Sequence, residues 1–327
     1  MRRNNGERWS DCGEQSTLPR PLGEMFPREP RLRSRLLPGM ARKPPPLHRH
    51  AQAGEKKKPA GRGFSGSDDK DIEEASKLRA PVIYETLRRE GEDEMDRPFT
   101  SLWWSGVAAG LSISFSLLAQ AILKSHLPDT PWRPLISDLG YSVGFLMVIL
   151  ARQQLFTENT ITAVLPFIAT PGPRALRRLA RMWGIVLSAN LAGAFFAALF
   201  CTFTPAVSPE IRHTMVQISV DSTSAGALDT FFLGISAGFL MAAMVWLLPS
   251  AEGAQFLVIT LVTYLIAIGG FAHIVAGSVE TFMLVVGGRE GIGWALVQFL
   301  LPALAGNIVG GSALFAVIAY GQVAKEV

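Results

Sequence analysis

Two groups of polar residues interrupt apolar parts of this sequence and could carry chemistry. The stretch RQQLFTENT, residues 152–160, lies inside the apolar region YSVGFLMVILARQQLFTENTITAVLPFIA. A second stretch, GGFAHIVAGS, places His273 inside another apolar region. An ionisable group at the middle of a membrane segment is costly to bury and by default marks a path for ions or protons. A neutral imidazole there could donate a hydrogen bond to a monovalent anion or exchange a proton with it. The alternative is a histidine that only ties two broken helices together.

The composition divides the chain into two unlike parts. Residues 1–98 hold 21 of the 31 Lys and Arg residues and Pro-rich runs such as RKPPPLHRH. This part has too little apolar surface to offset chain entropy, so residues 1–66 are expected to be a disordered basic tail. The opening residues have no apolar core of a signal peptide, and Met25 or Met40 is an alternative start of translation. A basic tail of this kind is typical of contact with anionic lipid headgroups.

The remaining sequence predicts an all-α polytopic membrane protein. Residues 67–98 are expected to form a cytoplasmic surface helix and linker, with Ser67 and Asp68 as helix caps and a further turn or two on the membrane face. The membrane domain is expected over 99–322, followed by a short tail at 323–327. Six transmembrane helices are predicted, at 101–123, 139–169, 183–203, 231–248, 254–287 and 294–320. The Arg-rich loop 170–182 is then cytoplasmic by the positive-inside rule, and so are both termini.

The second and fifth predicted spans are too long for straight helices. They would measure roughly 46 Å and 51 Å, against a hydrocarbon core of about 30 Å. Each is interrupted near its middle, which predicts two half-helices around a break that must be buried in protein or line a cavity. ANLAGAFF (189–196) resembles GNIVGGSA (306–313) at an offset of 117, and Leu155 lies 118 residues before His273. Two inverted three-helix repeats are therefore predicted, with a permeation site at their breaks.

Four segments together resemble the formate/nitrite transporter family: GFLMVILARQQLFTENTITAVLP, GIVLSANLAGA, GGFAHIVAG and GNIVGG. The form with RQQLFTENT is similar to a subfamily of bacterial inner-membrane proteins. The likeness covers roughly residues 100–322. It implies an aquaporin-like six-helix protomer in the bacterial inner membrane, assembled as a homopentamer with one pore in each protomer. It also implies that the break in the second span is the family's Ω-shaped loop and that the break in the fifth is its S-shaped loop.

The resemblance assigns a substrate pathway to four residues. His273 corresponds to the family's central histidine, and Thr157 to the threonine of the Ω loop, whose hydroxyl could bond the histidine or the ligand. Leu155 and Phe156 correspond to the apolar constriction beside it. The implied function is a channel or transporter for small monovalent anions or their weak acids, with proton coupling through the histidine as one form of it.

The chain departs from the family at three places. Ala272 stands where the family has a glutamate before the histidine, and Gly277 stands where it has an asparagine. No lysine occurs between residues 125 and 324, although the channels have one before the fourth span that draws anions inward. The substrate therefore does not follow from the resemblance.

The other polar residues of the break are expected to stabilise it. The ends of half-helices leave backbone groups unpaired, and side chains such as Gln153 can satisfy them. Arg152 and Glu158 are expected to form an ion pair or two hydrogen-bonded anchors, because buried charges are paired. The alternative is functional: Glu158 accepts a proton or repels anions while Arg152 attracts them. The residues predicted to stabilise the breaks or to line the pore are Arg152, Gln154, Glu158, Asn159, Asn190 and Asn307.

Other features predict packing and exclude some functions. Glycines at small-xxx-small spacing predict close helix contacts, and Asp138, Glu280 and Arg289 are expected in headgroup water at span ends. The sequence has no phosphate loop, metal cluster, nucleophile–base set or nucleic-acid motif, so no enzyme, cofactor or nucleic-acid partner is predicted. Two alternatives stay open beside the anion pathway. One is a channel for a neutral solute, although paired NPA motifs are absent. The other is a scaffold whose tail recruits a partner or lipid.

Overall fold

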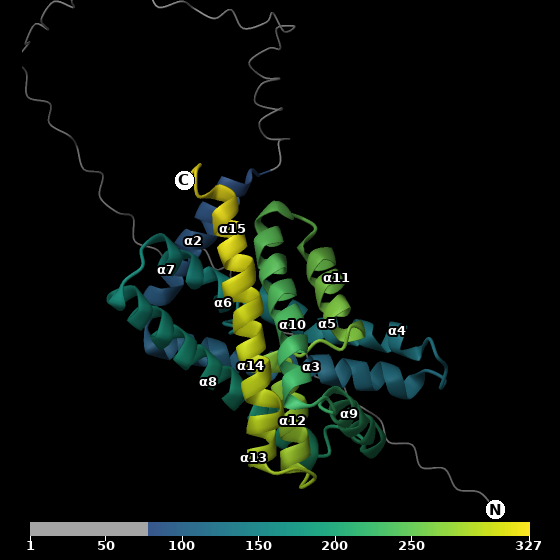
Figure 1. Ribbon diagram of the computed structural model, residues 1–327. Helices are drawn as coiled ribbons and strands as arrows, with labels where there is room; N and C mark the ends of the chain where they lie inside the picture. The colour runs from purple at the N-terminus through teal and green to yellow at the C-terminus, as the bar shows by residue number, and fades with distance from the viewer. Residues whose placement is uncertain (1–77) are drawn as a thin grey trace, which may run out of the picture. The chain divides into compact units, whose positions relative to one another are not determined.

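The structure is a computed structural model that describes residues 78–327, and every regular element in this range is helical (Figure 1). The predicted tail over 1–66 and the expected caps Ser67 and Asp68 lie outside the described residues. The longer helices are α2 (Ala80–Asp96), α3 (Phe99–His126), α8 (Pro173–Phe203), α9 (Pro209–Ser222), α10 (Ala227–Leu247), α11 (Gln255–Ile268) and α12 (Ile274–Val286). The shorter ones are α4 (Arg133–Ser137), η1 (Asp138–Tyr141), α5 (Ser142–Leu150), α6 (Asn159–Thr162), α7 (Val164–Ala169), η2 (Leu248–Ser250) and α13 (Ile292–Trp294). The last helical stretch continues through η3 (Ala295–Leu300), α14 (Leu301–Ile308), η4 (Val309–Ala316) and α15 (Val317–Val323), of which η3 and η4 are π-helical.

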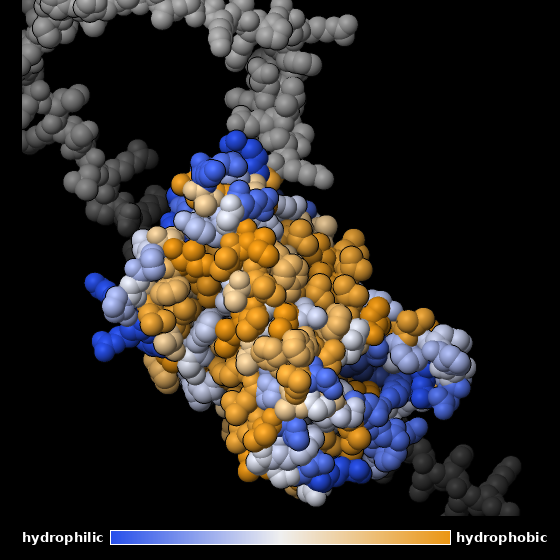
Figure 2. Space-filling view, in the orientation of Figure 1, coloured by the Kyte–Doolittle hydropathy of each residue, from blue (hydrophilic) through white to orange (hydrophobic). Residues whose placement is uncertain are grey.

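Five helical stretches of the described residues are long and apolar enough to cross a membrane. They are Phe99–His126, Arg133–Leu150, Pro173–Phe203, Ala227–Ser250 and Ile292–Val323. Three shorter apolar stretches are Asn159–Ala169, Gln255–Ile268 and Ile274–Val286. Non-helical breaks thus fall at 151–158 and 269–273, inside the two segments that the sequence predicts to be interrupted. A broad apolar band covers the visible face between hydrophilic ends (Figure 2).

Glycines bring the long helices into direct backbone contact, in two pairs. Helix α3 packs on α8, where a Cβ at Gly193 would lie 2.3 Å from the carbonyl oxygen of Val107. Helix α10 packs on α14 in the same way, and a Cβ at Gly238 would lie 2.3 Å from the carbonyl oxygen of Asn307. No larger side chain fits at such positions unless the helices separate. These small residues therefore set the distance between the straight helices that flank the breaks.

Helix α2 is longer and more deeply packed than the sequence analysis expects. It extends for 17 residues and contacts α6, α7 and α15, whereas only a turn or two on the membrane face was predicted. Its buried residues recur at helical spacing and are Ile83, Tyr84, Leu87, Gly91 and Met95. At the point of closest approach, a Cβ on Gly91 would lie 1.8 Å from the carbonyl oxygen of Thr162. The apolar stripe of α2 therefore covers protein.

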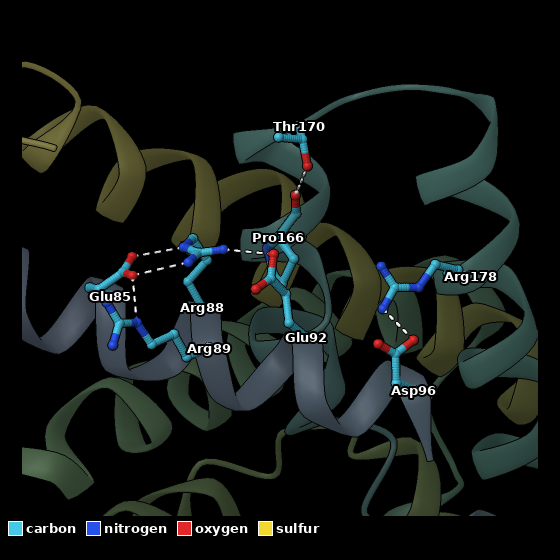
Figure 3. Close-up of polar contacts among 8 residues, drawn as sticks. All are labelled: Glu85, Arg88, Arg89, Glu92, Asp96, Pro166, Thr170 and Arg178. Carbon is cyan, nitrogen blue, oxygen red and sulfur yellow. Dashed lines mark hydrogen bonds and ion pairs between the residues drawn. The ribbon is translucent and has the colours of Figure 1, made fainter. Parts of the chain in front are cut away.

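Charged side chains beside this buried stripe pair with one another and with α8 (Figure 3). Arg88 and Arg89 both donate to the carboxylate of Glu85 at 2.7 Å, and these hydrogen bonds lower the pKa of Glu85 to about 2. Arg178 of α8 donates to Asp96 at 2.6 Å. The end of α2 is thus joined to the Arg-rich start of α8.

A second helix that the sequence analysis does not predict lies between α8 and α10. The predicted spans at 183–203 and 231–248 leave residues 204–230 as a connecting loop, but Pro209–Ser222 form α9. Ser208 caps this helix by accepting the amide N–H of Ile211 at 3.3 Å. Helix α9 packs on α3 and α12 and so covers one side of the second half-helix after the break.

The close contact of α3 and α8 yields the first prediction. Replacing Gly193 by Ala should lower the free energy of unfolding by about 1–3 kcal/mol, because the methyl group must displace the backbone of α3. Gly184 is the matched control on the same helix, since no atom lies within 4 Å of the position that a Cβ would take there. Gly184→Ala should stabilise the helix by about 1 kcal/mol. Thermal unfolding of the detergent-solubilised protein measures both, and equal effects of the two variants would contradict the packing.

Candidate functional site

The helices before the two breaks end with the same backbone geometry. Arg152 and Gly270 adopt left-handed φ angles of 52° and 61°. The amides of Gln153 and Phe271, the next residues, donate to carbonyls five positions earlier at 2.9 and 3.0 Å. This arrangement is a Schellman C-cap, which satisfies carbonyls at a helix end. The two caps are 118 residues apart, although only one of them uses the glycine that this conformation favours.

Asn190 connects the first break to two straight helices. It lies on α8 and is fully buried. Its Oδ1 accepts the amide N–H of Phe156 at 2.9 Å. Its Nδ2 donates at 2.8 Å both to the carbonyl of Gln154 in the break and to the carbonyl of Gly106 on α3. One carboxamide therefore satisfies backbone groups that the interrupted helix leaves unpaired.

Asn307 makes the corresponding set of bonds at the second break. Its Oδ1 accepts the amide N–H of Ile274 at 2.8 Å. Its Nδ2 donates to the carbonyl of Ala272 at 2.8 Å and to the carbonyl of Gly234 on α10 at 2.9 Å. The partners in the break are again 118 residues from those of Asn190. Both breaks are thus held by a buried asparagine on a neighbouring helix.

The two breaks meet at a hydrogen bond between Thr157 and His273. Nε2 of the imidazole lies 2.8 Å from the Thr157 hydroxyl oxygen, and both side chains are buried. Nδ1 accepts the amide N–H of Ala276 at 3.1 Å, so that His273 caps α12. A neutral imidazole with Nδ1 as acceptor carries its proton on Nε2. Nε2–H therefore donates to Thr157, which leaves the hydroxyl hydrogen of Thr157 free to donate to a third group.

Apolar side chains surround this hydrogen bond. The edge of the Phe145 ring meets His273, with ring centroids 5.0 Å apart. Leu155 and Phe156 are almost fully buried, and Phe156 packs against the indole of Trp183, which donates to the carbonyl of Asn159 at 3.0 Å. These apolar neighbours lower the dielectric around the hydrogen bond between Thr157 and His273, which strengthens it.

Other polar residues tie the first break to helix α2. The amide of Gln154 donates to the carboxylate of Glu94 at 2.7 Å, and Asn159 donates to Gln154 at 3.2 Å. The backbone N–H of Gln154 donates to Ser105 at 3.0 Å. Gln153, by contrast, makes no side-chain hydrogen bond with a described residue.

The expected pairing of Arg152 with Glu158 is wrong. The Arg152 side chain is 84% exposed and pairs with Glu90 of α2 at 3.6 Å. The backbone of Arg152 is left-handed and its side chain lies outside the break, so the guanidinium avoids the cost of burial. Glu158 is half-buried, and its carboxylate has no hydrogen bond or ion pair with a described residue.

A cavity of about 440 Å³ leads to His273 from the end of the domain opposite the Arg-rich start of α8. Leu155, Phe156 and Thr157 do not line it, so the cavity reaches the imidazole and stops there. Besides His273, the polar and charged side chains of its wall are Gln120, Lys124, Asp129, Thr130, Arg133, Ser137, Asp138, Tyr141, Asp221, Ser222 and Glu280. Nearer the break, apolar residues such as Gly277, Phe271 and Phe299 share the wall with His273.

The expectation that Asp138 and Glu280 lie in headgroup water at span ends is wrong. Glu280 is 5% exposed and accepts a hydrogen bond from Ser222 of α9. Asp138 accepts from the amide of Gln120 at 3.1 Å and from the hydroxyl of Ser137 at 3.4 Å. Helical periodicity could have indicated Glu280, because residues seven positions apart share one face of a helix and His273 precedes it by seven. Its partner Ser222 could not be foreseen, since α9 was missed.

Within residues 78–327, no group of three or more His, Cys, Asp and Glu side chains could hold a metal ion. The chemistry that the described residues offer is hydrogen bonding and proton transfer at Thr157 and His273.

The asparagine bridges yield the second prediction. Asn190→Ala should lower the free energy of unfolding by about 2–4 kcal/mol, because buried backbone groups at the break lose their partners. Asn307→Ala should have a similar effect through the second break. Ser188→Ala is the control, since the exposed Ser188 hydroxyl bonds only to carbonyls of its own helix. Thermal unfolding in detergent checks all three, and a loss for Ser188→Ala as large as that for Asn190→Ala would contradict the assignment.

Comparisons with known proteins agree on one family. The model of the formate/nitrite transporter family matches residues 81–321. The chain is 43% identical over 250 residues to the inner membrane protein YfdC of Escherichia coli (strain K12), which covers 76% of this chain and 80% of that protein. It is 27% identical over 247 residues to the formate channel FocA of Haemophilus influenzae, which covers 66% and 84%. A solved pentameric formate channel with formate bound superposes with a TM-score of 0.59 over 70% of this chain and 98% of that one.

At 20% identity the likeness to this solved channel concerns the fold alone. The chain therefore belongs to the formate/nitrite transporter family.

Proposed function

We propose that this protein is a transmembrane channel or transporter for a small monovalent anion or its weak acid. The single observation that carries this proposal is a cavity that ends at a buried histidine, held between two broken helices. Broken helices at membrane depth are tolerated where they line a passage. The position of His273 in the wall of this cavity supports a passage that leads to it.

Thr157 and His273 are the groups that would contact the substrate. With Nε2–H donated to Thr157, the threonine hydroxyl hydrogen can donate to an oxygen of a carboxylate or of nitrite. Transfer of a proton to the anion would require a cationic imidazole. A proton taken up at Nδ1, in place of the bond from the Ala276 N–H, would let Nε2–H pass to the Thr157 oxygen while the hydroxyl proton passes to the anion. This converts the anion into its acid and returns the imidazole to the neutral form. Leu155 and Phe156 would form the apolar constriction that an uncharged species crosses more readily than an ion. Proton coupling through His273 is thus part of the proposal.

Architecture and assembly follow from the same proposal. The described helices fit six spans if each pair of half-helices counts as one, with two three-helix repeats in inverted orientation. The bond patterns of Asn190 and Asn307 support this relation. A homopentamer is supported by the assembly of the formate channel of similar fold. A bacterial inner-membrane location is supported by the E. coli relative. The Arg-rich start of α8 supports a cytoplasmic position for α2 and both termini.

The third prediction concerns flux through His273. Liposomes that contain the protein and a pH dye should take up protons with formate or nitrite faster than protein-free vesicles, which correct for leakage of weak acids through lipid. His273→Ala should reduce the excess flux by about tenfold or more. This factor corresponds to the free energy of roughly one lost hydrogen bond to the substrate. Stopped-flow fluorescence with formate, nitrite, acetate and chloride measures the effect and ranks the substrates.

Two further variants make this test specific. Thr157→Val should also reduce flux, whereas Thr157→Ser, which keeps the hydroxyl, should retain most of it. His213→Ala is the control for loss of a histidine, because His213 is exposed on α9 and does not line the cavity. Unchanged flux in His273→Ala would refute the role of the histidine. No excess flux of any anion, from folded protein, would favour a neutral solute or a scaffold.

A further inference from the structure

The charges of the cavity wall, taken with the proposed function, indicate which form of the substrate enters. We infer that Glu280, together with Asp138, makes this cavity exclude anions, so that a weak acid enters from this side in its uncharged, protonated form. Neither residue belongs to the pathway that the sequence analysis predicts. The inference rests on the proposed function for the identity of the permeant, but the charge of the cavity can be measured without transport.

The basic residues of the wall are both neutralised by acids. Lys124 at the end of α3 pairs with Asp221 of α9 at 3.5 Å. Arg133 at the start of α4 pairs with Asp129 at 2.9 Å. These pairs leave the cavity without a free cation among the described residues. An anion that enters from this end therefore meets no basic group that could replace its hydration.

The acidic residues are more numerous, and two have no basic partner among the described residues. Asp138 is held by Gln120 and Ser137, and Glu280 by Ser222. All of these donors are neutral, so they orient the carboxylates without cancelling their charge. With four acids against two bases, the wall carries an excess of two negative charges when all are ionised. Low-dielectric walls strengthen such a field within a cavity.

Glu280 is placed where this field acts on the approach to the histidine. It follows His273 by seven residues on α12, which puts it roughly 10 Å further along the helix axis on the same face. The hydroxyl of Ser222 on α9 donates to Glu280. The other ionisable groups of the surrounding elements that line the same cavity are Asp221 of α9, Tyr141 and Asp138 of η1, and Lys124 of α3. Lys124 is the single cation among them and is paired with Asp221. A substrate must pass this carboxylate to reach His273.

The step between Glu280 and His273 is apolar. Gly277 occupies this face of α12, and the ring of Phe299 packs directly over it, 2.1 Å from the position that a Cβ would take. This is the position at which the family has an asparagine. An ion would lose hydration here without gaining a polar partner, whereas an uncharged acid would lose little. The acidic wall and the ring of Phe299 over Gly277 thus both disfavour the anion.

Hydrogen-bond capacity points in the same direction. Oε1 of Glu280 accepts no hydrogen bond from a described residue, and Oε1 of Gln120 is buried without a donor. Nδ1 of His273 already accepts an amide N–H. The wall thus holds unused acceptors on Glu280 and Gln120, together with the hydroxyl of Tyr141, which can donate or accept. A protonated acid brings an O–H donor to them, whereas its anion brings none.

The cavity charge can be measured by the reactivity of a single cysteine. Ala267→Cys places a thiol in the wall, in a chain with Cys12→Ser and Cys201→Ser. Cationic and anionic thiosulfonate reagents of similar size are compared, each relative to its rate with free cysteine. The cationic reagent should react faster. Glu280→Gln or Asp138→Asn should reduce the ratio of the cationic to the anionic rate by about fourfold or more. One unit charge roughly 10 Å away in water changes each rate by about twofold, in opposite directions for the two reagents.

Glu290→Gln is the matched control, because Glu290 is exposed near the same end of α12 but does not line the cavity. It should leave the rate ratio unchanged. A preference for the anionic reagent in the parent chain would overturn the inference. A ratio unaffected by both Glu280→Gln and Asp138→Asn would do so too. Because two separate acids are tested, poor folding of one variant leaves the other to decide.

A flux measurement then connects the charge to selectivity. Wild-type protein should pass formate but little chloride, which cannot be protonated in water, in mildly alkaline buffer that keeps the wall carboxylates ionised. Glu280→Gln, whose carboxamide oxygen can still accept from Ser222, should increase chloride entry and keep formate entry close to wild type. Chloride flux equal to formate flux in the wild type would overturn the inference. Absence of formate flux in every variant, with the cysteine result as expected, would instead refute the proposed function alone.

Discussion

The need to satisfy backbone polar groups away from water is the constraint on which this structure depends. A helix that is interrupted inside a membrane exposes N–H and C=O groups that lipid cannot bond. Here two interruptions are stabilised by one asparagine each, and each asparagine contributes both an acceptor and two donors. With Schellman caps before both breaks and the His273 cap of α12 after the second, the breaks become fixed structures. Only fixed breaks can bring Thr157 and His273 within hydrogen-bond distance.

Helix packing makes this arrangement possible. The asparagine side chains reach both a break and a straight helix because glycines allow the backbones of α3 and α8, and of α10 and α14, to approach closely. Helices α2 and α9 pack against this core and cover the two ends of the domain. Helix α2 reaches the first break through Glu94, and α9 reaches the cavity through Ser222. Hydrogen bonds thus join one end of the domain to the first break and the other end to the cavity wall.

Much of this could be predicted from the sequence, for reasons that are local. Over-long apolar runs with polar middles located both breaks, and the repeated Asn and Gly pattern of 189–196 and 306–313 indicated their common supports. The pairing of Arg152 was mispredicted because burial was inferred from sequence position, whereas a left-handed backbone turns this side chain outward. Helix α9 and the burial of Glu280 were missed because both depend on tertiary contacts. A polar 14-residue segment has no clear apolar period until α3 and α12 supply its partner surface.

The most direct test of the account is whether Thr157 and His273 are neighbours on the path of the substrate. A cysteine at position 157 beside the imidazole would offer a thiolate and a nitrogen to Zn²⁺, which binds them at about 2.3 and 2.0 Å. Formate flux through Thr157→Cys, in a chain with Cys12→Ser and Cys201→Ser, should be blocked reversibly by low concentrations of Zn²⁺. Addition of His273→Ala should abolish high-affinity zinc binding, measured on the same protein by competition with a chelating dye. Flux through Thr157→Cys that persists while Zn²⁺ is bound, or zinc affinity that does not depend on His273, would contradict the account.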